Sequence, residues 1–278
     1  MPNKNILFLG DICSEIGRNA VINNLKKVRE MENVAFTIAE GENSAAGFGI
    51  TPKIAHELFE AGVDCITLGD HFLDRNEIVT TLESDSRILR PANFHADVPG
   101  RGANIYVNGD SKIGVISLLG RVFLKPINCP FERAITEIEN IKKETPLILV
   151  DFHAEATAEK KALGWYLNGK VSGVIGTHTH VQTADEQILP NGTAYITDIG
   201  MCGAMNSVLG MRIDLSVKKL IYSIPLRLQP AKENVHINGA IITVDTETGI
   251  AQTIRRLDLK ITNLNQINNS LNIHKNSE

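Results

Sequence analysis

Hydrophobic and polar positions along the chain follow two alternating patterns. Short apolar, β-rich runs are each followed by an amphipathic stretch with apolar residues every three or four positions, the spacing of a helix packed against a sheet. The runs expected to form buried strands are 6–9, 34–39, 65–68, 147–150 and 171–175. The stretches expected to form helices are 18–29, 52–61, 77–82, 132–142 and 158–167. This alternation of strand and helix predicts an α/β fold.

Two local features refine this prediction. Thr51 precedes Pro52, which suits an N-cap followed by the first helical position, where the missing N–H of proline costs nothing. After Gly192 the pattern changes to short β-rich runs with no helix expected among them, at 193–197, 221–228, 235–244 and 253–259. We expect this second part of the chain to complete a second sheet.

Residues that can bind a metal ion follow directly after the apolar runs. Ligands of open α/β sheets bind outside the carboxyl ends of the strands, so these residues can meet in one crevice. His178 and His180 are two residues apart, and in a strand they would point to the same face. The whole set is Asp11, Glu42, Asn43, Asp70, His71, His153, His178 and His180. Carboxylate, amide and imidazole ligands together favour Mn, Fe or Zn over Mg or Ca, and seven or so ligands indicate two ions.

Several of these residues also have an ordinary structural interpretation. Asp11 could cap the helix expected from residue 18. Asn43 could satisfy a turn through its own backbone contacts. A bare His-x-His pair could also lie in a loop without binding anything. Asp151 and Glu155 flank His153 and could orient its imidazole by accepting a hydrogen bond from its other ring N–H.

The order of these motifs resembles that of the calcineurin-like metallophosphoesterases. Longer stretches of sequence are similar to the YmdB-type bacterial cyclic-nucleotide phosphodiesterases. These stretches are residues 90–94, 151–157, 176–185 and 194–201. The resemblance extends from about residue 6 to about residue 259. It implies a four-layer α-β-β-α sandwich, a fold with which the change of pattern after Gly192 is consistent.

The resemblance also implies a role for each candidate ligand. One metal ion would be bound by Asp11, Asn43 and His180, and the other by Asp70, His153 and His178. Glu42 would bridge the two ions, and His71 would stabilise the developing charge or protonate the leaving oxygen. Glu40 falls outside the matched pair Glu42-Asn43 and is not expected to be a ligand. Iron or manganese is expected, with zinc as the other candidate.

The function implied is hydrolysis of small cyclic nucleotides, 2′,3′- and/or 3′,5′-cyclic monophosphates, by a hydroxide that bridges two metal ions. A phosphomonoesterase or protein phosphatase on the same scaffold is the main alternative. A non-catalytic regulatory protein that keeps the metal site is the third hypothesis. A TIM-barrel amidohydrolase also uses His-x-His, but there the pair normally follows the first strand, whereas here it comes after Asp11, Glu42 and His153.

The chain departs from the family pattern at Gly69-Asp70-His71, where the family usually has Gly-Asn-His. A carboxylate at Asp70 adds one negative charge to the cluster, so it should bind metal more strongly and repel an anionic substrate more. We expect Asp70 still to be a ligand. The aromatic residue that commonly follows two positions after the His is here Leu73, which weakens the case for a base stacking at that position.

Composition limits the partners of the protein. The chain has 278 residues, of which 43% are hydrophobic and 22% charged. This is long enough to bury the core of one domain, which we expect over 1–262. We expect the polar tail at 263–278 to be frayed or loosely docked. A net charge of −4 gives no basic stripe, so a small phosphodiester is expected rather than extended nucleic acid. No apolar run is long enough for a membrane span, and the four cysteines are scattered. We therefore expect a cytoplasmic protein, and the resemblance implies a homodimer or homotetramer.

Overall fold

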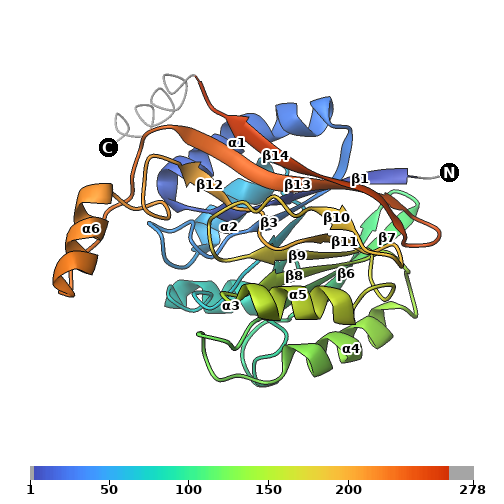
Figure 1. Ribbon diagram of the computed structural model, residues 1–278. Coiled ribbons are helices and arrows are strands. Elements are labelled where there is room, and N and C mark those ends of the chain that lie inside the picture. The colour runs from blue at the N-terminus through green and yellow to red at the C-terminus, as the bar shows by residue number, and fades with distance from the viewer. Residues whose placement is uncertain (1–2, 263–278) are drawn as a thin grey trace.

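Two β-sheets lie face to face in the computed structural model, which describes residues 3–262 (Figure 1). The first sheet has eight strands in the order β2-β12-β13-β1-β3-β4-β5, with β14 paired to β13. Its core is parallel from β1 through β3 and β4 to β5, and β13 runs antiparallel to β1. The strands are β1 (Asn3–Leu9), β2 (Asp11–Ile12), β3 (Val34–Glu40), β4 (Cys65–Thr67), β5 (Ile88–Leu89), β12 (Met201–Ala204), β13 (Val235–Asp245) and β14 (Ala251–Lys260).

The second sheet has six strands in the order β10-β11-β9-β8-β7-β6. Strands β7, β8, β9 and β11 are parallel to one another, and β6 and β10 are antiparallel edge strands. The strands are β6 (Ala103–Asn108), β7 (Ser111–Leu119), β8 (Ile148–His153), β9 (Gly173–Thr177), β10 (Gln187–Ile188) and β11 (Ala194–Ile196).

Helices cover the outer face of each sheet and complete four layers. Three apolar clusters separate the layers: one between the first sheet and its helices, one between the sheets, and one between the second sheet and its helices. The first sheet packs against α1 (Ser14–Met31), α2 (Pro52–Glu60), η1 (Asn76–Ile78) and α3 (Val79–Ser84). The second packs against α4 (Pro130–Ile141) and α5 (Thr157–Tyr166). The predicted α-β-β-α sandwich is confirmed.

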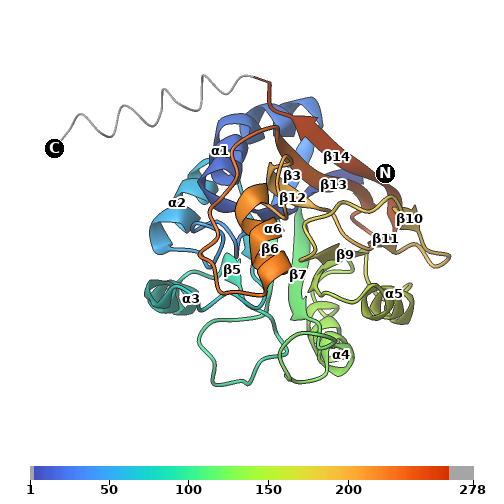
Figure 2. The same cartoon turned by 60° about the vertical axis from the view of Figure 1, so that its left-hand side comes forward.

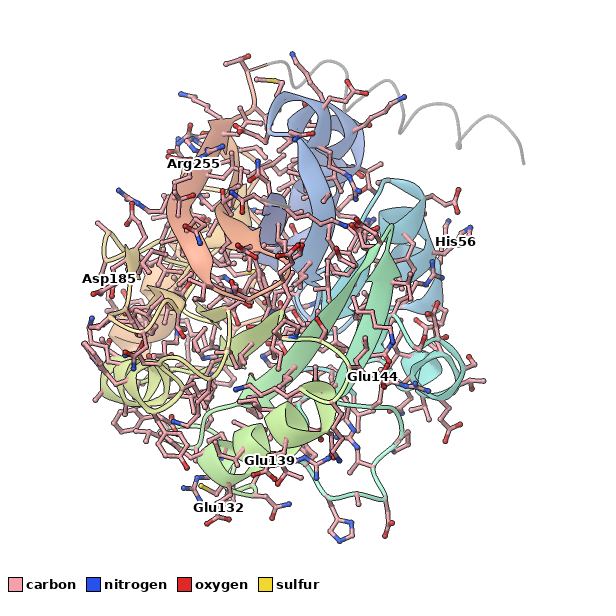
Figure 3. All side chains as sticks on the ribbon, turned by 90° about the vertical axis from the view of Figure 1, so that its right-hand side faces the viewer. His56, Glu132, Glu139, Glu144, Asp185 and Arg255 are labelled. Atoms are coloured by element: carbon pink, nitrogen blue, oxygen red, sulfur yellow. The ribbon has the colours of Figure 1, made fainter. Side chains whose placement is uncertain are left out.

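The near-continuous apolar runs of the central strands follow from this layering. Successive side chains of a strand point to opposite faces, and both faces of these sheets are covered. In β1, Ile6 and Phe8 therefore contact the cluster between the sheets, whereas Leu7 and Leu9 contact α1 and its neighbours. The helices are apolar on one side only, and on α4 the exposed Glu132 and Glu139 point away from the sheet (Figure 3).

The expected start of the second helix is confirmed. The Thr51 hydroxyl accepts a hydrogen bond from the Ile54 amide, and Pro52 occupies the first helical turn. The first helix begins at Ser14, earlier than expected, and Cys13 is its N-cap. The interpretation of Asp11 as a helix cap is therefore wrong, because Asp11 lies in β2.

The part of the chain after Gly192 differs from the prediction in two ways. The strand expected at 221–228 is wrong, because a sixth helix, α6 (Ile213–Tyr222), ends there and is followed by Ser223 in the left-handed conformation. Helix α6 was not expected from the sequence, because its large apolar side chains face solvent and only Ser216 is buried. The late strands also do not complete the second sheet: β11 joins it, but β12, β13 and β14 belong to the first.

Two further expectations concern chain organisation. The predicted polar tail at 263–278 lies outside the described residues, and the single domain over 1–262 stays a prediction. Within residues 3–262, no helix has both the length and the apolar character needed to cross a bilayer.

Candidate metal centre

The candidate ligands lie where the carboxyl ends of strands from both sheets meet. Asp11 opens β2, Glu42 follows β3, and Asp70 follows β4, all in the first sheet. His153 is the last residue of β8, and His178 comes directly after β9, both in the second sheet. The expected convergence is therefore found, and it joins two sheets rather than one.

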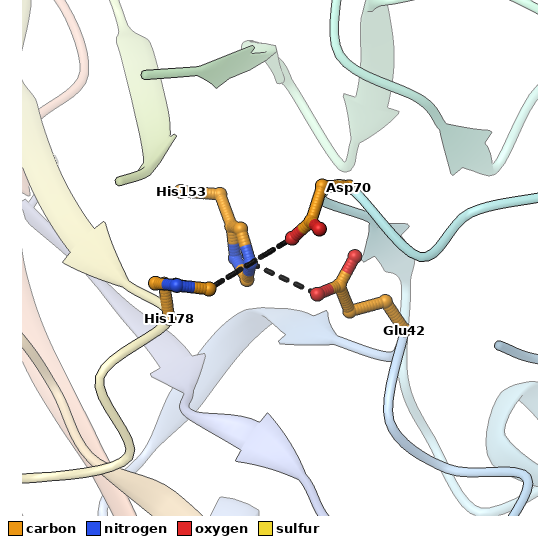
Figure 4. Close-up of side chains that lie close together, drawn as sticks. All are labelled: Glu42, Asp70, His153 and His178. Carbon is orange, nitrogen blue, oxygen red and sulfur yellow. Dashed lines mark hydrogen bonds and ion pairs between the residues drawn. The ribbon is translucent and has the colours of Figure 1, made fainter. Parts of the chain in front are cut away.

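One group of four ligand atoms comes from Glu42, Asp70, His153 and His178, and all four atoms lie within 4.8 Å of one another (Figure 4). The Nε2 atom of His153 is at the centre: it lies 2.9 Å from Glu42 Oε1 and 3.7 Å from Asp70 Oδ1. The Nδ1 atom of His178 lies 2.9 Å from the same nitrogen and 3.9 Å from Asp70 Oδ1. This group contains the three residues expected for one metal ion together with the expected bridge.

A second group adjoins the first, because Asp11 has a carboxylate oxygen within 4.8 Å of ligand atoms of Glu42 and His153. His180 Nε2 lies 3.1 Å from Asn43 Oδ1 and 3.6 Å from Asp11 Oδ1. The Asn43 amide nitrogen donates to the Gly47 carbonyl at 3.1 Å, which leaves the amide oxygen toward the centre. The structure thus brings together Asp11, Asn43 and His180, the residues expected for the other ion.

The donor set fits a metal ion because its oxygens lack other partners. Among the described residues, Asp11 Oδ1, Glu42 Oε1 and Asp70 Oδ1 are buried and have no hydrogen-bond donor. Buried polar atoms are nearly always paired, and an unpaired buried charge is costly. A cation between these oxygens would remove that cost.

The hydrogen bonds of His153 fix which nitrogen faces the centre. The Thr177 hydroxyl donates to Asp151 Oδ1 at 2.8 Å, so its lone pair accepts from His153 Nδ1 at 3.0 Å. His153 Nε2 is then the nitrogen that faces the oxygens of Glu42 and Asp70, where it would bind a metal ion. The expected direct contact of Asp151 with the imidazole is wrong, because Asp151 acts through Thr177.

The other two histidines are oriented in the same way. His178 Nε2 lies 3.2 Å from the Glu155 carboxylate, which leaves Nδ1 toward the cluster. His180 Nδ1 lies 3.1 Å from the Leu209 carbonyl, which leaves Nε2 toward Asn43 and Asp11. Glu155 therefore orients His178 rather than His153.

Electrostatics at the centre show an excess of negative charge. Burial opposes protonation of His153, but the Glu42 and Asp70 carboxylates outweigh it and raise the His153 pKa well above its ordinary value. Burial and the neighbouring His153 lower the pKa of His178 to about 4, so its ring stays neutral at physiological pH. In the protein without a cation, a proton on His153 balances part of the charge that a metal ion would balance.

The segment from His178 to His180 has an unusual backbone. Strand β9 ends at Thr177, and the φ angles of His178 and His180 are 102° and 63°, conformations that non-glycine residues adopt at a cost. The argument that both side chains share one face of a strand is therefore wrong. The two rings instead reach different groups of the centre, because the backbone turns between them.

A buried ion pair holds this segment in place. Lys160 Nζ lies 2.7 Å from Asp198 Oδ2, and both side chains are at most 1% exposed. The same ammonium donates to the Thr177 carbonyl, and Asp198 accepts from the Thr179 amide. The pair thus fixes the backbone on both sides of His178.

His71 lies beside the first group. Its Nδ1 is 2.8 Å from the Asp74 carboxylate, and its Nε2 is 3.9 Å from Asp70 Oδ2. Its backbone amide donates to Glu42 Oε2 at 2.8 Å, which fixes its distance from the cluster. The side chain is 28% exposed, so the ring can meet a ligand that enters from solvent.

Glu40 is closer to the centre than the sequence analysis expected. It is fully buried, and one of its carboxylate oxygens groups with Asp11, Glu42 and His153. Burial and the charges of Asp11 and Glu42 raise the Glu40 pKa well above its usual range. Its carboxyl group accepts from the Glu42 amide at 3.2 Å, so Glu40 supports the position of Glu42.

A cavity of about 450 Å³ opens onto the centre. Glu42, Asn43, His71, His178 and His180 contribute to its polar side. Gly69 lies behind the cluster, where a Cβ atom would come within 2.2 Å of the His153 ring. Only glycine leaves room for that imidazole.

Comparison with known proteins shows the family of the chain. The sequence model of the family described as YmdB-like protein matches residues 7–257. The chain belongs to the YmdB-like family. A curated relative from Bacillus subtilis, named 2′,3′-cyclic-nucleotide 2′-phosphodiesterase, is 44% identical over 252 residues, covering 91% of this chain and 96% of the relative.

Two solved structures are similar to this YmdB-like protein over nearly their whole length. One, described as a novel phosphatase from Mycoplasma pneumoniae, has a TM-score of 0.88 at 31% identity and covers 94% of each chain. The other, described as a hypothetical protein from Thermus thermophilus, has a TM-score of 0.86 at 34% identity and covers 92% of this chain and 99% of that one.

Sequence reasoning missed three residues that shape this YmdB-like site: Thr177, Asp74 and Phe48. Thr177 stands immediately before the first histidine of the pair, and Asp74 is three residues after His71. Their closeness in sequence to these histidines was the signal that could have identified them. Phe48 lies between two glycines, a setting that often presents a side chain from a tight loop.

Proposed function

We propose that this chain is a metal-dependent phosphoric diester hydrolase acting on small cyclic nucleotides. The convergence of two ligand groups that share Glu42 carries the proposal. The name of the Bacillus subtilis relative supports 2′,3′-cyclic monophosphates as substrates, and 3′,5′-cyclic monophosphates are the second substrate class.

Seven residues would hold the two ions. Asp11, Asn43 and His180 would bind one, Asp70, His153 and His178 the other, and Glu42 both. When bound, such a pair of ions lowers the pKa of a water molecule and neutralises phosphate oxygens. Nitrogen and oxygen donors without thiolate support iron or manganese, with zinc as the alternative.

The protein's own residues would complete the reaction. Asp74 holds His71 Nδ1, so the opposite nitrogen is the one available to a ligand. A leaving alkoxide needs a proton, and His71 Nε2, which lies 3.9 Å from Asp70 Oδ2, would supply it. The cavity at its side would hold the rest of the substrate.

The test compares a chromogenic phosphodiester with the matching monoester, using protein loaded with Mn²⁺ or, anaerobically, Fe²⁺. We expect kcat/KM for the diester to exceed that for the monoester at least about ten-fold, which corresponds to about 1.4 kcal/mol of transition-state discrimination. Hydrolysis of 2′,3′- and 3′,5′-cyclic nucleotides is then measured. A faster reaction with the monoester would favour the phosphatase alternative, which the description of the Mycoplasma pneumoniae structure supports.

The proposal includes a homodimer or homotetramer in the cytoplasm. Ile213, Val217 and Ile221 lie exposed on α6, which projects from the body of the protein (Figure 1). Such an apolar face supports self-association, which light scattering in solution tests. The four cysteines are free, which supports a reducing compartment.

A further inference from the structure

The cavity at the metal centre has an apolar side that the chemistry described so far does not use. Besides the candidate ligands it is lined by Phe48, Val208, Leu209, Met211, Leu220 and Leu228. A volume of about 450 Å³ with one polar and one apolar side is typical of a site for a small organic ligand. A phosphodiester group alone would leave this side exposed to water.

Phe48 is the aromatic residue of this wall, and its position is fixed. The Asn43 amide donates to the Gly47 carbonyl, and Arg75 Nε donates to the Phe48 carbonyl at 3.2 Å. Gly47 and Gly49, with φ angles of 97° and 75°, allow the tight loop that presents the ring. The side chain is nevertheless 45% exposed, so an apolar group in the cavity could bury it.

The ring lies next to the proposed general acid. The ring centroids of Phe48 and His71 are 5.2 Å apart, with an angle of 79° between the planes. A ligand whose phosphate lies at His71 therefore has its neighbouring group beside Phe48. Leu73, where the usual aromatic residue is missing, does not line the cavity.

Helix α6 supplies another part of the wall. Leu220 is 74% exposed in the structure yet lines the cavity, and Lys219 adds a cation beside it. Figure 2 shows α6 standing in front of the two sheets. An aromatic ring bound between Phe48 and Leu220 would cover both side chains.

We propose that Phe48 and Leu220 form a subsite that binds the nucleobase of the substrate. The inference rests on the proposed function and deepens it, because it assigns the selection of nucleosides over other cyclic diesters to these two residues. Base–aromatic stacking is worth about ten-fold or more in affinity and tolerates different bases, so the preference applies to nucleotides as a class.

The experiment compares adenosine 2′,3′-cyclic phosphate with methyl riboside 2′,3′-cyclic phosphate, which has the same diester but no base. We expect the native protein to prefer the nucleotide at least about ten-fold in kcat/KM, mainly through KM. Phe48→Ala should bring this ratio below about two, and Phe48→Trp should retain it. Trp165→Ala is the matched control, because Trp165 is an exposed aromatic residue outside the cavity.

Calorimetric binding of adenosine 3′-phosphate and methyl riboside 3-phosphate gives a readout independent of turnover. Equal affinities in the native protein, or a preference unchanged in Phe48→Ala, would overturn the subsite. A preference for the nucleotide that depends on Phe48, in a protein that hydrolyses neither diester, would support the subsite and contradict the proposed function. Hydrolysis of both diesters at equal rates and equal KM would support the proposed function and contradict the subsite.

Discussion

The floor and the rim of the cavity are built in different ways. At the floor, Glu42 and His153 are almost completely buried, and each candidate histidine ligand has its second ring nitrogen in a hydrogen bond or ion pair. At the rim, Phe48 and Leu220 are exposed and present apolar surface from a loop and a projecting helix. The floor is thus organised before any ligand arrives, whereas the rim gains its contacts from the ligand.

This contrast separates two demands on such a site. Chemistry requires donor atoms held within a few tenths of an ångström, which a buried hydrogen-bonded network provides. Selection among substrates requires surface that the substrate can cover. Substitutions at the floor should therefore abolish metal binding or folding, and changes toward the rim should alter substrate preference by smaller factors.

The largest effect is expected at Glu42, which both ligand groups share. Glu42→Gln keeps the shape but removes the bridging charge, so both ions should bind poorly and kcat/KM should fall about 10³-fold or more, equivalent to several kcal/mol. Elemental analysis measures the metal content, and a diester hydrolysis assay measures kcat/KM. Glu40→Gln is the matched control: because the Glu40 carboxyl has a raised pKa and supports Glu42 by a hydrogen bond, its loss should be below about ten-fold. Equal losses in the two variants would contradict the assigned roles.

A second test compares a buried ion pair with an exposed one, using two adjacent lysines. Lys160→Met leaves Asp198 as an unpaired buried charge and frees the backbone around His178, so the free energy of unfolding should fall by about 3–5 kcal/mol. Lys161→Met breaks an ion pair with Asp185 that is open to solvent, with side-chain exposures of 47% and 27%, and should cost below about 1 kcal/mol. Urea unfolding of the metal-free proteins measures both. Similar losses would show that the pair does not hold the His178–His180 segment.

The candidate ligands could be named from the sequence, but the residues that support them could not. Asp11, Glu42 and His153 stand out because each lies at or just beyond the end of an apolar run, and parallel strands bring such ends together. The role of Thr177 depends on the register between β8 and β9, which pairs His153 with Thr177. No local pattern in the sequence gives that register.

The fold shows the same limit. Alternation of strand and helix predicted the α/β fold, because these elements bury one or both of their faces within the chain, whereas the four layers were implied by the resemblance to a known family. Helix α6 escaped prediction because it buries only Ser216. The late strands were assigned to the wrong sheet because β13 pairs with β1, so that residues at opposite ends of the sequence, such as Asn3 and Asp245, lie side by side.

The smallest effect is expected at Asp70, which lies between floor and rim and is 14% exposed. Burial opposes its ionised form, but the neighbouring His153, whose Nε2 is 3.7 Å from Asp70 Oδ1, outweighs burial and holds the Asp70 pKa well below its ordinary value, so its full negative charge faces an incoming phosphate. Asp70→Asn keeps an oxygen in place and removes that charge, so KM for a cyclic nucleotide should fall about two- to five-fold, since charges near a surface interact through a high effective dielectric. Metal affinity should weaken over the same range, as titration with Mn²⁺ would show. Asp70→Ala removes the oxygen itself, and if that variant bound two ions as tightly as the native protein, Asp70 would not be a ligand.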